Sequence, residues 1–248
     1  MNSAATSLLT HLTLPSGLVA EHLLEAGFDG YILDLQHGEL DTAAALRILQ
    51  ATSKLTEFPY ARLAASDPAV IARLLDNGCR GIIAPMIESV QQCLDLVGAC
   101  MYPPLGSRSY GPVRPNLFEG NDFGDAANRA VLPMIQIESA PGVTNAKALL
   151  SVPGIAGVYL GPADLARSYG LGFGTDWDSG PVWDAIVGVS ALARRRGLKF
   201  GIFCKEAEYA ASLDKAGLTD FIGLGGDLMM VNSAARDNVK DFARAAAI

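Results

Sequence analysis

The sequence predicts a TIM barrel, an eight-stranded (β/α)8 fold, as a single domain over residues 1–248. Short apolar runs alternate with longer amphipathic stretches along the chain, which indicates repeated βα units. Eight such units in about 250 residues is the usual size of this fold. A doubly wound sheet is the alternative, but it usually has a glycine-rich fingerprint after its first strand, which this chain lacks.

The eight apolar runs are the expected strands, and they are bounded by glycine, proline or charged residues. They cover residues 8–13, 30–34, 59–63, 81–85, 131–137, 156–160, 199–203 and 220–224. The stretches between them carry apolar residues at helical spacing. The clearest are 17–27, 41–53, 67–78 and 205–217. Several open with Asp or Ser and close with Gly, as helices with regular caps do.

The composition narrows the class of protein. Hydrophobic residues make up 50% and charged residues 18%, a balance that suits a sheet buried on both faces. The chain contains no run of 18 or more apolar residues, so no membrane span is expected. The first apolar run is not preceded by basic residues, so the start of the chain does not resemble a signal peptide. The net charge of −7 argues against nucleic acid as a partner. Four cysteines without a CxxC pair favour reduced thiols in a cytoplasmic protein.

In this fold the active site lies at the carboxyl ends of the strands. Five polar residues are expected there: Asp34 and His37 after the second strand, Arg62 at the end of the third, Glu138 after the fifth and Asp164 after the sixth. We therefore expect these side chains to share one pocket.

Glu138 and Asp164 are the candidate metal ligands. Two carboxylates in one pocket would repel each other, and a divalent cation would relieve the repulsion. Oxygen ligands suit Mg²⁺ or Mn²⁺, with Co²⁺ as a further candidate. The alternative is that Asp164 caps the following helix and Glu138 pairs with an arginine.

Arg62 and His37 are the candidates for catalysis. An arginine that ends an apolar strand is costly unless it is paired, so Arg62 would bind an oxyanion, a substrate carboxylate or a neighbouring acid. His37 would act as a base, since the pKa of histidine is near neutrality, or else be a solvated loop residue. The glycine-rich stretch 223–227 would bind an anion or simply form a tight turn. His11, within a strand, and His22, within a helix, have a weaker claim.

Four segments carry a resemblance to a known family. They are D-x-x-H at 34–37, YPPLGSRSYG at 102–111, QIES at 136–139 and GPADLA at 161–166. With these four segments in this order, the chain resembles the HpcH/HpaI aldolases, which are metal-dependent class II pyruvate aldolases. The likeness covers nearly the whole chain. It implies a TIM barrel that reversibly adds pyruvate, or a close 2-oxo acid, to an aldehyde and cleaves 4-hydroxy-2-oxo acids.

The resemblance also implies binding roles. Glu138 and Asp164 match the family's ligands of the divalent metal. Gln136, Ala163 and Asp164 match positions that hold pyruvate, partly through backbone amides at the start of a helix. Arg62 matches the arginine that stabilises the enolate, and so belongs to both substrate binding and catalysis.

The catalytic roles follow in the same way. His37 matches the base, and Asp76 matches an aspartate that raises the basicity of this histidine. Asp76 is expected at the end of a helix, at the opposite end of the barrel, so its role requires a different helix boundary, a neighbouring subunit or an indirect effect. Asp34 is the nearer candidate for orienting His37. Gln36 stands where the family commonly has glutamate.

The aldehyde side of the pocket is less well defined by the sequence. Residues 101–130, expected as a loop after the fourth strand, and 168–180 should shape it, because long loops in compact domains are usually functional. Arg108, Tyr110 and Arg114 would contact a polar aldehyde or anchor the loop.

The resemblance implies a homo-oligomer, a hexamer built as a trimer of dimers with exchanged C-terminal helices. The amphipathic tail would pack on its own barrel or on a neighbour's. Two other functions remain: a citrate-lyase-type enzyme acting on CoA thioesters, and a non-catalytic barrel that binds a 2-oxo acid.

Overall fold

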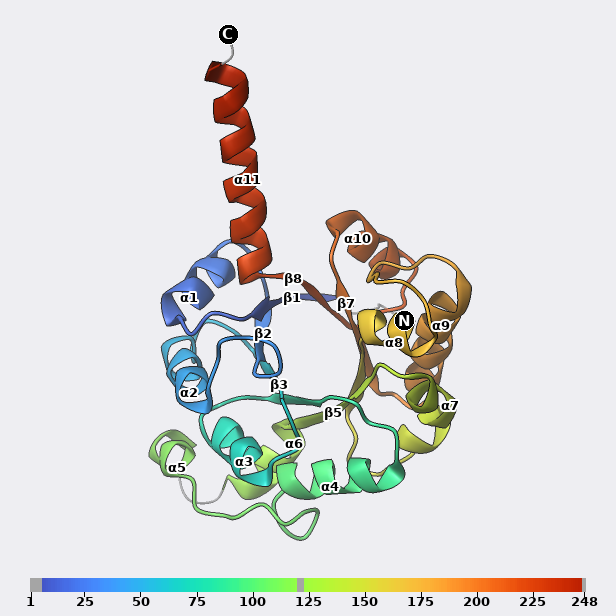
Figure 1. Cartoon of the computed structure of the whole chain (residues 1–248). Coiled ribbons are helices and arrows are strands. Elements are labelled where there is room, and N and C mark those ends of the chain that lie inside the picture. The colour runs from blue at the N-terminus through green and yellow to red at the C-terminus, as the bar shows by residue number, and fades with distance from the viewer. Residues whose placement is uncertain (1–5, 120–122, 247–248) are drawn as a thin grey trace.

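A computed structural model describes residues 6–119 and 123–246 (Figure 1). Eight parallel strands form a closed barrel in chain order, and β8 pairs with β1 to close it. The predicted TIM barrel is therefore confirmed. The strands are β1 Ser7–Leu12, β2 Gly30–Asp34, β3 Phe58–Arg62, β4 Gly81–Ala84, β5 Leu132–Ile137, β6 Gly157–Leu160, β7 Lys199–Cys204 and β8 Phe221–Gly226.

Helices surround the barrel, except for the last one, which extends away from it (Figure 1). They are α1 Gly17–Glu25, α2 Thr42–Ala51, α3 Pro68–Asp76, α4 Val90–Cys100, α5 Val113–Glu119, α6 Gly124–Ala130, α7 Ala140–Leu149, α8 Pro162–Ser168, α9 Gly180–Arg195, α10 Ala207–Lys215 and α11 Asp227–Ala246. None of the helices in the described part of the chain combines the length and apolar character that crossing a membrane requires.

The predicted strands lie within two residues of the observed ones. Helix starts follow the expected capping chemistry, because the side chains of Ser16, Asp41 and Asp67 accept hydrogen bonds from the first turns of α1, α2 and α3. Local sequence signals thus define most of the elements.

Aromatic and aliphatic side chains fill the inside of the barrel. Tyr159 stacks on Phe221 with ring centroids 5.7 Å apart, and Tyr60 meets Phe221 edge to face. Gly201 leaves room for this layer, because a Cβ at that position would lie 2.1 Å from the Phe221 ring. The packed interior supports the active-site cavity from below, as in other TIM barrels. A second core lies between the strands and the helices.

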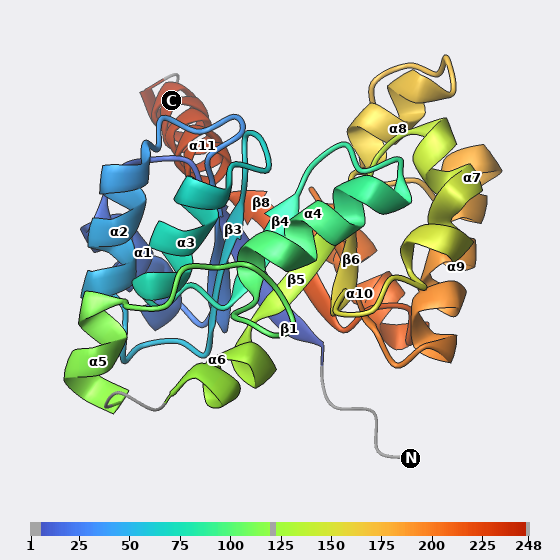
Figure 2. The same ribbon diagram turned by 90° about the horizontal axis from the view of Figure 1, so that it is seen from below.

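The expectation of a loop after the fourth strand at 101–130 is wrong. Helix α4 comes first and returns the chain to the other end of the barrel, so this segment leads from α4 into β5. It contains α5 and α6. Figure 2 shows them near the end where β1 starts, whereas α8 lies at the opposite end.

Candidate active site

A cavity of about 380 Å³ opens at the carboxyl ends of the barrel strands. Of the residues predicted for catalysis, metal binding or pyruvate binding, all except Asp76 line it, namely Asp34, His37, Arg62, Gln136, Glu138, Ala163 and Asp164. The shared pocket expected from strand-end positions is therefore present. The stretch 168–180 contributes Phe173 and Thr175 to its wall.

Asp34 and Arg62 form a buried ion pair at the ends of β2 and β3, where they are register partners. Arg62 Nε donates to Asp34 Oδ1 over 3.0 Å and Nη2 donates to Oδ2 over 2.6 Å. Burial alone would raise the pKa of Asp34, but contacts with His11 and Arg62 outweigh it and hold that pKa well below its usual range. Arg62 is thus paired with a neighbouring acid while it lines the cavity.

Asp34 also holds the turn that follows β2. Its Oδ1 accepts the backbone N–H groups of Gln36 and His37, each over 3.2 Å. Among the described residues, no side chain is hydrogen-bonded to the His37 imidazole. Asp34 therefore orients His37 through the backbone, rather than through the ring as expected for a catalytic pair.

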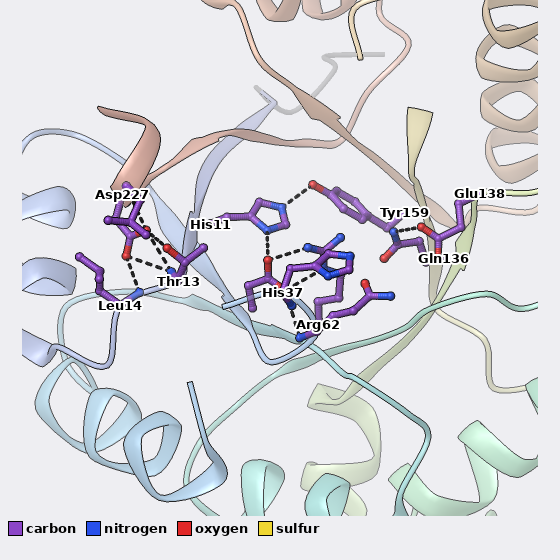
Figure 3. Close-up of polar contacts among 12 residues, drawn as sticks. His11, Thr13, Leu14, His37, Arg62, Gln136, Glu138, Tyr159 and Asp227 are labelled. Carbon is purple, nitrogen blue, oxygen red and sulfur yellow. Dashed lines mark hydrogen bonds and ion pairs between the residues drawn. The ribbon is translucent and has the colours of Figure 1, made fainter. Parts of the chain in front are cut away.

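Glu138 is almost fully buried at the end of β5. Its Oε1 accepts the backbone N–H of Met86 over 2.8 Å. Its Oε2 accepts from Gln136 Nε2 over 2.5 Å (Figure 3). Burial raises the pKa of Glu138 to about 7, and the negative charge of Asp164 adds to the rise. The carboxyl group is therefore poised to lose its proton to a cation.

The donor set fits a small divalent cation. Asp164 does not cap α8, because the N-cap is Gly161 and no side chain caps it, so this carboxylate remains available. A Cβ at Gly161 would lie 2.6 Å from Glu138 Oε2, so the glycine keeps space beside the carboxylate. The buried Oε1 of Gln136 has no partner in the described structure.

Within the described ranges no group of three or more His, Cys, Asp or Glu residues could enclose a metal. The chain thus offers two carboxylates, Glu138 and Asp164, and leaves other coordination positions to substrate or water. This is the usual arrangement for Mg²⁺ in enzymes.

Two further polar side chains of the cavity, His11 and Tyr159, were not among the site residues predicted from the sequence, where His11 had only a weak claim. His11 Nε2 lies 2.9 Å from the Tyr159 hydroxyl, and His11 Nδ1 lies 3.8 Å from Asp34 Oδ2. Side chains alternate along a strand, so Leu9 and His11 both face the barrel interior. A histidine on the inward face of a barrel strand, one residue from its carboxyl end, was the available signal.

Asp227 joins the first and last parts of the barrel. Its carboxylate accepts the backbone N–H groups of Thr13 and Leu14, both over 2.9 Å, and the hydroxyl of Thr13 (Figure 3). The stretch 223–227 was expected to follow the last strand, but β8 continues to Gly226. The anion that meets backbone amides at this point is the side chain of Asp227 itself.

Asp76 is not brought to His37 within the chain. It ends α3 at the other end of the barrel and pairs there with Arg108. Both residues line a second cavity, of about 450 Å³, with Arg114. Arg114 Nη1 donates to the Asn77 carbonyl over 2.9 Å. Within one chain, Arg108 and Arg114 therefore anchor the 101–130 segment and lie away from the active-site cavity.

Tyr110 also belongs to this segment. It packs against Tyr102, with ring centroids 4.9 Å apart, and stacks on Phe123. An aromatic cluster thus holds the segment at the end of the barrel opposite the active-site cavity, and Tyr110 does not line that cavity.

Comparison with known proteins gives concordant results. The family model described as HpcH/HpaI aldolase/citrate lyase matches residues 9–234. A hydroxypyruvate/pyruvate aldolase from Rhizorhabdus wittichii is 36% identical over 97% of this chain and 95% of its own. A 4-hydroxy-2-oxo-heptane-1,7-dioate aldolase from Salmonella arizonae is 30% identical over 90% of this chain and 85% of its own. A crystal structure of a family protein from Burkholderia cenocepacia superposes with a TM-score of 0.86 at 28% identity, covering 96% of this chain and 95% of that one.

Proposed function

Because the chain belongs to the HpcH/HpaI aldolase/citrate lyase family, we propose that it is a class II aldolase that depends on a divalent metal. It adds pyruvate, or a close 2-oxo acid such as hydroxypyruvate, to an aldehyde, and it cleaves 4-hydroxy-2-oxo acids in reverse. One observation carries the proposal: a single cavity at the carboxyl ends of the strands is lined by Arg62, His37 and the carboxylates of Glu138 and Asp164.

In this proposal Glu138 and Asp164 hold the cation, which is Mg²⁺ or Mn²⁺, with Co²⁺ as a further candidate. When bound, the metal acts as a Lewis acid on the substrate carbonyl. Gln136 and the backbone amides of Ala163 and Asp164 orient the 2-oxo acid. The unpartnered amide oxygen of Gln136 supports a role in binding, since buried polar atoms normally have partners.

The proton transfer is assigned to His37. It removes a proton from the methyl group of pyruvate, and the guanidinium of Arg62 stabilises the negative oxygen of the enolate. The enolate carbon then forms the new C–C bond to the aldehyde carbon as the π bond of the aldehyde breaks, and the resulting alkoxide takes up a proton, which balances the one that His37 removed. Asp34 keeps Arg62 charged and in place, because its two-pronged hydrogen bonds fix the guanidinium plane.

The test is pyruvate release from a small panel of 4-hydroxy-2-oxo acids with Mg²⁺ or Mn²⁺. We expect release with at least one compound, its loss after chelation with EDTA, and its return when metal is restored. Full activity after exhaustive chelation would contradict the metal mechanism. Pyruvate binding without turnover would favour a non-catalytic barrel that binds a 2-oxo acid.

A second candidate activity comes from the family description, which includes citrate lyases. Such an enzyme would act on CoA thioesters and would need basic residues for the CoA phosphates. The net charge of −7 gives this reading little support, and the curated relatives named above are aldolases. Cleavage of a citryl thioester without cleavage of 4-hydroxy-2-oxo acids would favour it.

We also propose that the protein is a homo-oligomer, a hexamer arranged as a trimer of dimers, in which α11 is exchanged between subunits. Helix α11 extends away from its own barrel (Figure 1). Its apolar side chains Val239 and Phe242 are 69% and 75% exposed, so the chain alone does not cover them. A neighbouring subunit would bury this face.

A further inference from the structure

His11 and Tyr159 have no part in the chemistry proposed so far, although both line the cavity. They come from β1 and β6, on different sides of the barrel. Both are almost completely buried, at 4% and 0% exposure. Burying two polar groups is costly unless they are hydrogen-bonded, and their 2.9 Å contact meets that need.

The surrounding structure makes room for this pair. A Cβ at Gly223 would lie 2.2 Å from the Tyr159 hydroxyl and 3.1 Å from His11 Nε2, so a larger residue on β8 would displace both. Phe203 packs edge-on against the His11 ring, and Phe221 stacks on Tyr159. The two rings are thus held by packing on several sides.

The neighbouring charge determines the direction of the hydrogen bond. Asp34 Oδ2 lies 3.8 Å from His11 Nδ1, and an ionised carboxylate can only accept. The proton of a neutral His11 therefore belongs on Nδ1, facing Asp34. Nε2 is then a bare acceptor, and the Tyr159 hydroxyl must donate to it (Figure 3).

Protonation tendencies agree with this direction. Burial lowers the pKa of His11, so the ring is neutral near pH 7. Burial also raises the pKa of Tyr159 well above its ordinary value, so the phenol keeps its proton and remains a donor. A chain of polar contacts then runs from Tyr159 through His11 to Asp34, and Asp34 is in turn paired with Arg62.

We propose that His11 and Tyr159 are positioning residues for the reaction: Tyr159 holds the His11 ring by donating to Nε2, which supports the tautomer that Asp34 favours, and the Nδ1–H of His11 in turn positions Asp34 and its partner Arg62. Asp34 also holds the backbone of the turn that carries His37, so both groups assigned to catalysis depend on the same carboxylate. This inference rests on the proposed aldolase function for its kinetic consequences only.

Loss of the Tyr159 hydroxyl should disturb Asp34 through His11. Without its donor, the His11 ring can place its proton on Nε2 and turn a lone pair toward the Asp34 carboxylate. Repulsion would then shift Asp34 and with it the Arg62 guanidinium. Displacement of a positioned group by even 1 Å costs roughly a hundredfold in rate in other enzymes.

The kinetic test compares three variants that share one site. Tyr159→Phe removes only the hydroxyl, His11→Leu removes both contacts, and His11→Asn keeps an N–H donor near the place of Nδ1. We expect kcat to fall about ten- to a hundredfold in Tyr159→Phe and His11→Leu, with KM changed by less than about threefold. His11→Asn should keep kcat within about fivefold of wild type, and adding Tyr159→Phe to it should have no further effect.

Tyr31→Phe is the matched control. Tyr31 is another buried tyrosine whose hydroxyl makes a 2.6 Å hydrogen bond, to Thr52, outside the active-site cavity. It should lower the thermal stability without changing kcat. Equal losses in His11→Asn and His11→Leu, or wild-type kcat in Tyr159→Phe, would overturn the proposal. If His11→Leu does not fold, the kcat values of Tyr159→Phe and His11→Asn still test the proposal.

A spectroscopic test is independent of activity. The chain has only three histidines, so ¹⁵N-histidine NMR signals can be assigned by single replacements of His22 and His37. We expect a neutral His11 with its proton on Nδ1, and a changed tautomer ratio in Tyr159→Phe. A proton on Nε2 in the wild type would overturn the inference. If the wild type cleaves no 4-hydroxy-2-oxo acid, the proposed function fails, but the NMR measurement of the His11 tautomer still tests the His11–Tyr159 interaction.

Discussion

At the scale of single residues, Asp34 and Glu138 lie in one cavity but differ in how readily they lose a proton. Asp34 contacts His11 and accepts two hydrogen bonds from Arg62, so its pKa is held low despite burial. Glu138 has one backbone and one amide donor and a neighbouring carboxylate, so burial dominates and its pKa rises to about 7. Asp34 is thus a permanent partner for a cationic side chain, whereas Glu138 gains from a metal ion.

The pKa of Glu138 predicts how metal affinity depends on pH. Below pH 7 the cation must displace a proton from Glu138, whereas above pH 7 the carboxylate is already ionised. We therefore expect Mn²⁺ or Mg²⁺ to bind roughly tenfold more weakly at pH 6 than at pH 8, measured by isothermal titration calorimetry. Glu138→Gln should bind weakly and without this pH dependence. A constant affinity for the wild type would contradict the assignment.

Replacement of His37 tests the proposed base. His37→Ala should slow the exchange of pyruvate methyl protons with deuterated water by about a hundredfold or more, because proton abstraction loses its acceptor. The exchange is followed by proton NMR in the presence of metal. His22→Ala, on α1, is the control and should exchange at the wild-type rate. Undiminished exchange in His37→Ala would remove His37 from this role.

At the scale of elements, the strand ends other than those of β4 and β7 contribute polar groups to the cavity, and the following segments help to orient them. The turn after β2 is held by Asp34, and the turn after β1 is held by Asp227 at the start of α11. Because α11 begins at the cavity and then leaves the barrel, its orientation is coupled to the loop beside His11. Its exposed apolar side chains, Val239 and Phe242, are not covered by the chain itself.

The exposed face of α11 predicts a defect in assembly. Phe242→Asp should weaken subunit association by roughly thirtyfold or more, since apolar residues in interface cores contribute about 2 kcal/mol each. Light scattering over a concentration series measures the change. Arg244→Asp introduces the same side chain, with an even larger change in charge, at a position turned away from Val239 and should leave the assembly intact. An unchanged oligomer in Phe242→Asp would argue against helix exchange.

At the scale of the whole molecule, the cavity and the Asp76–Arg108 pair lie at opposite ends of one barrel. A role for Asp76 in the basicity of His37 therefore requires a second subunit. The exchanged α11 of the proposed hexamer would be one way to hold barrels together, and the end of α3 would then have to face a neighbour's cavity.

Subunit mixing tests this arrangement. If Asp76 acts on a neighbour's His37, His37→Ala and Asp76→Asn proteins should each be impaired, and mixed oligomers should regain measurable cleavage at interfaces with both native residues. The proteins are mixed after mild dissociation and assayed for pyruvate release. His37→Ala mixed with a His37→Ala, Asp76→Asn double variant is the control and should stay inactive. Failure of the mixture to regain activity would remove Asp76 from the site.

The sequence by itself determined the alternation of strands and helices, and with it the end of the barrel where Arg62 and Glu138 lie. Both follow from local patterns, because a strand's direction decides which of its ends faces the active site. The sequence did not reveal that the 101–130 segment lies at the end of the barrel opposite the active site. That placement depends on α4, the helix after β4 that returns the chain to that end.

Only the tertiary structure decided the pairing of His11 with Tyr159 and the pairing of Asp76 with Arg108. The first pair is 148 residues apart in the chain, and it forms because closure of the barrel brings inward-facing side chains from non-adjacent strands together. Sequence periodicity assigns a side chain to a face, but contacts across a closed barrel depend on packing and on the space left by glycines such as Gly223.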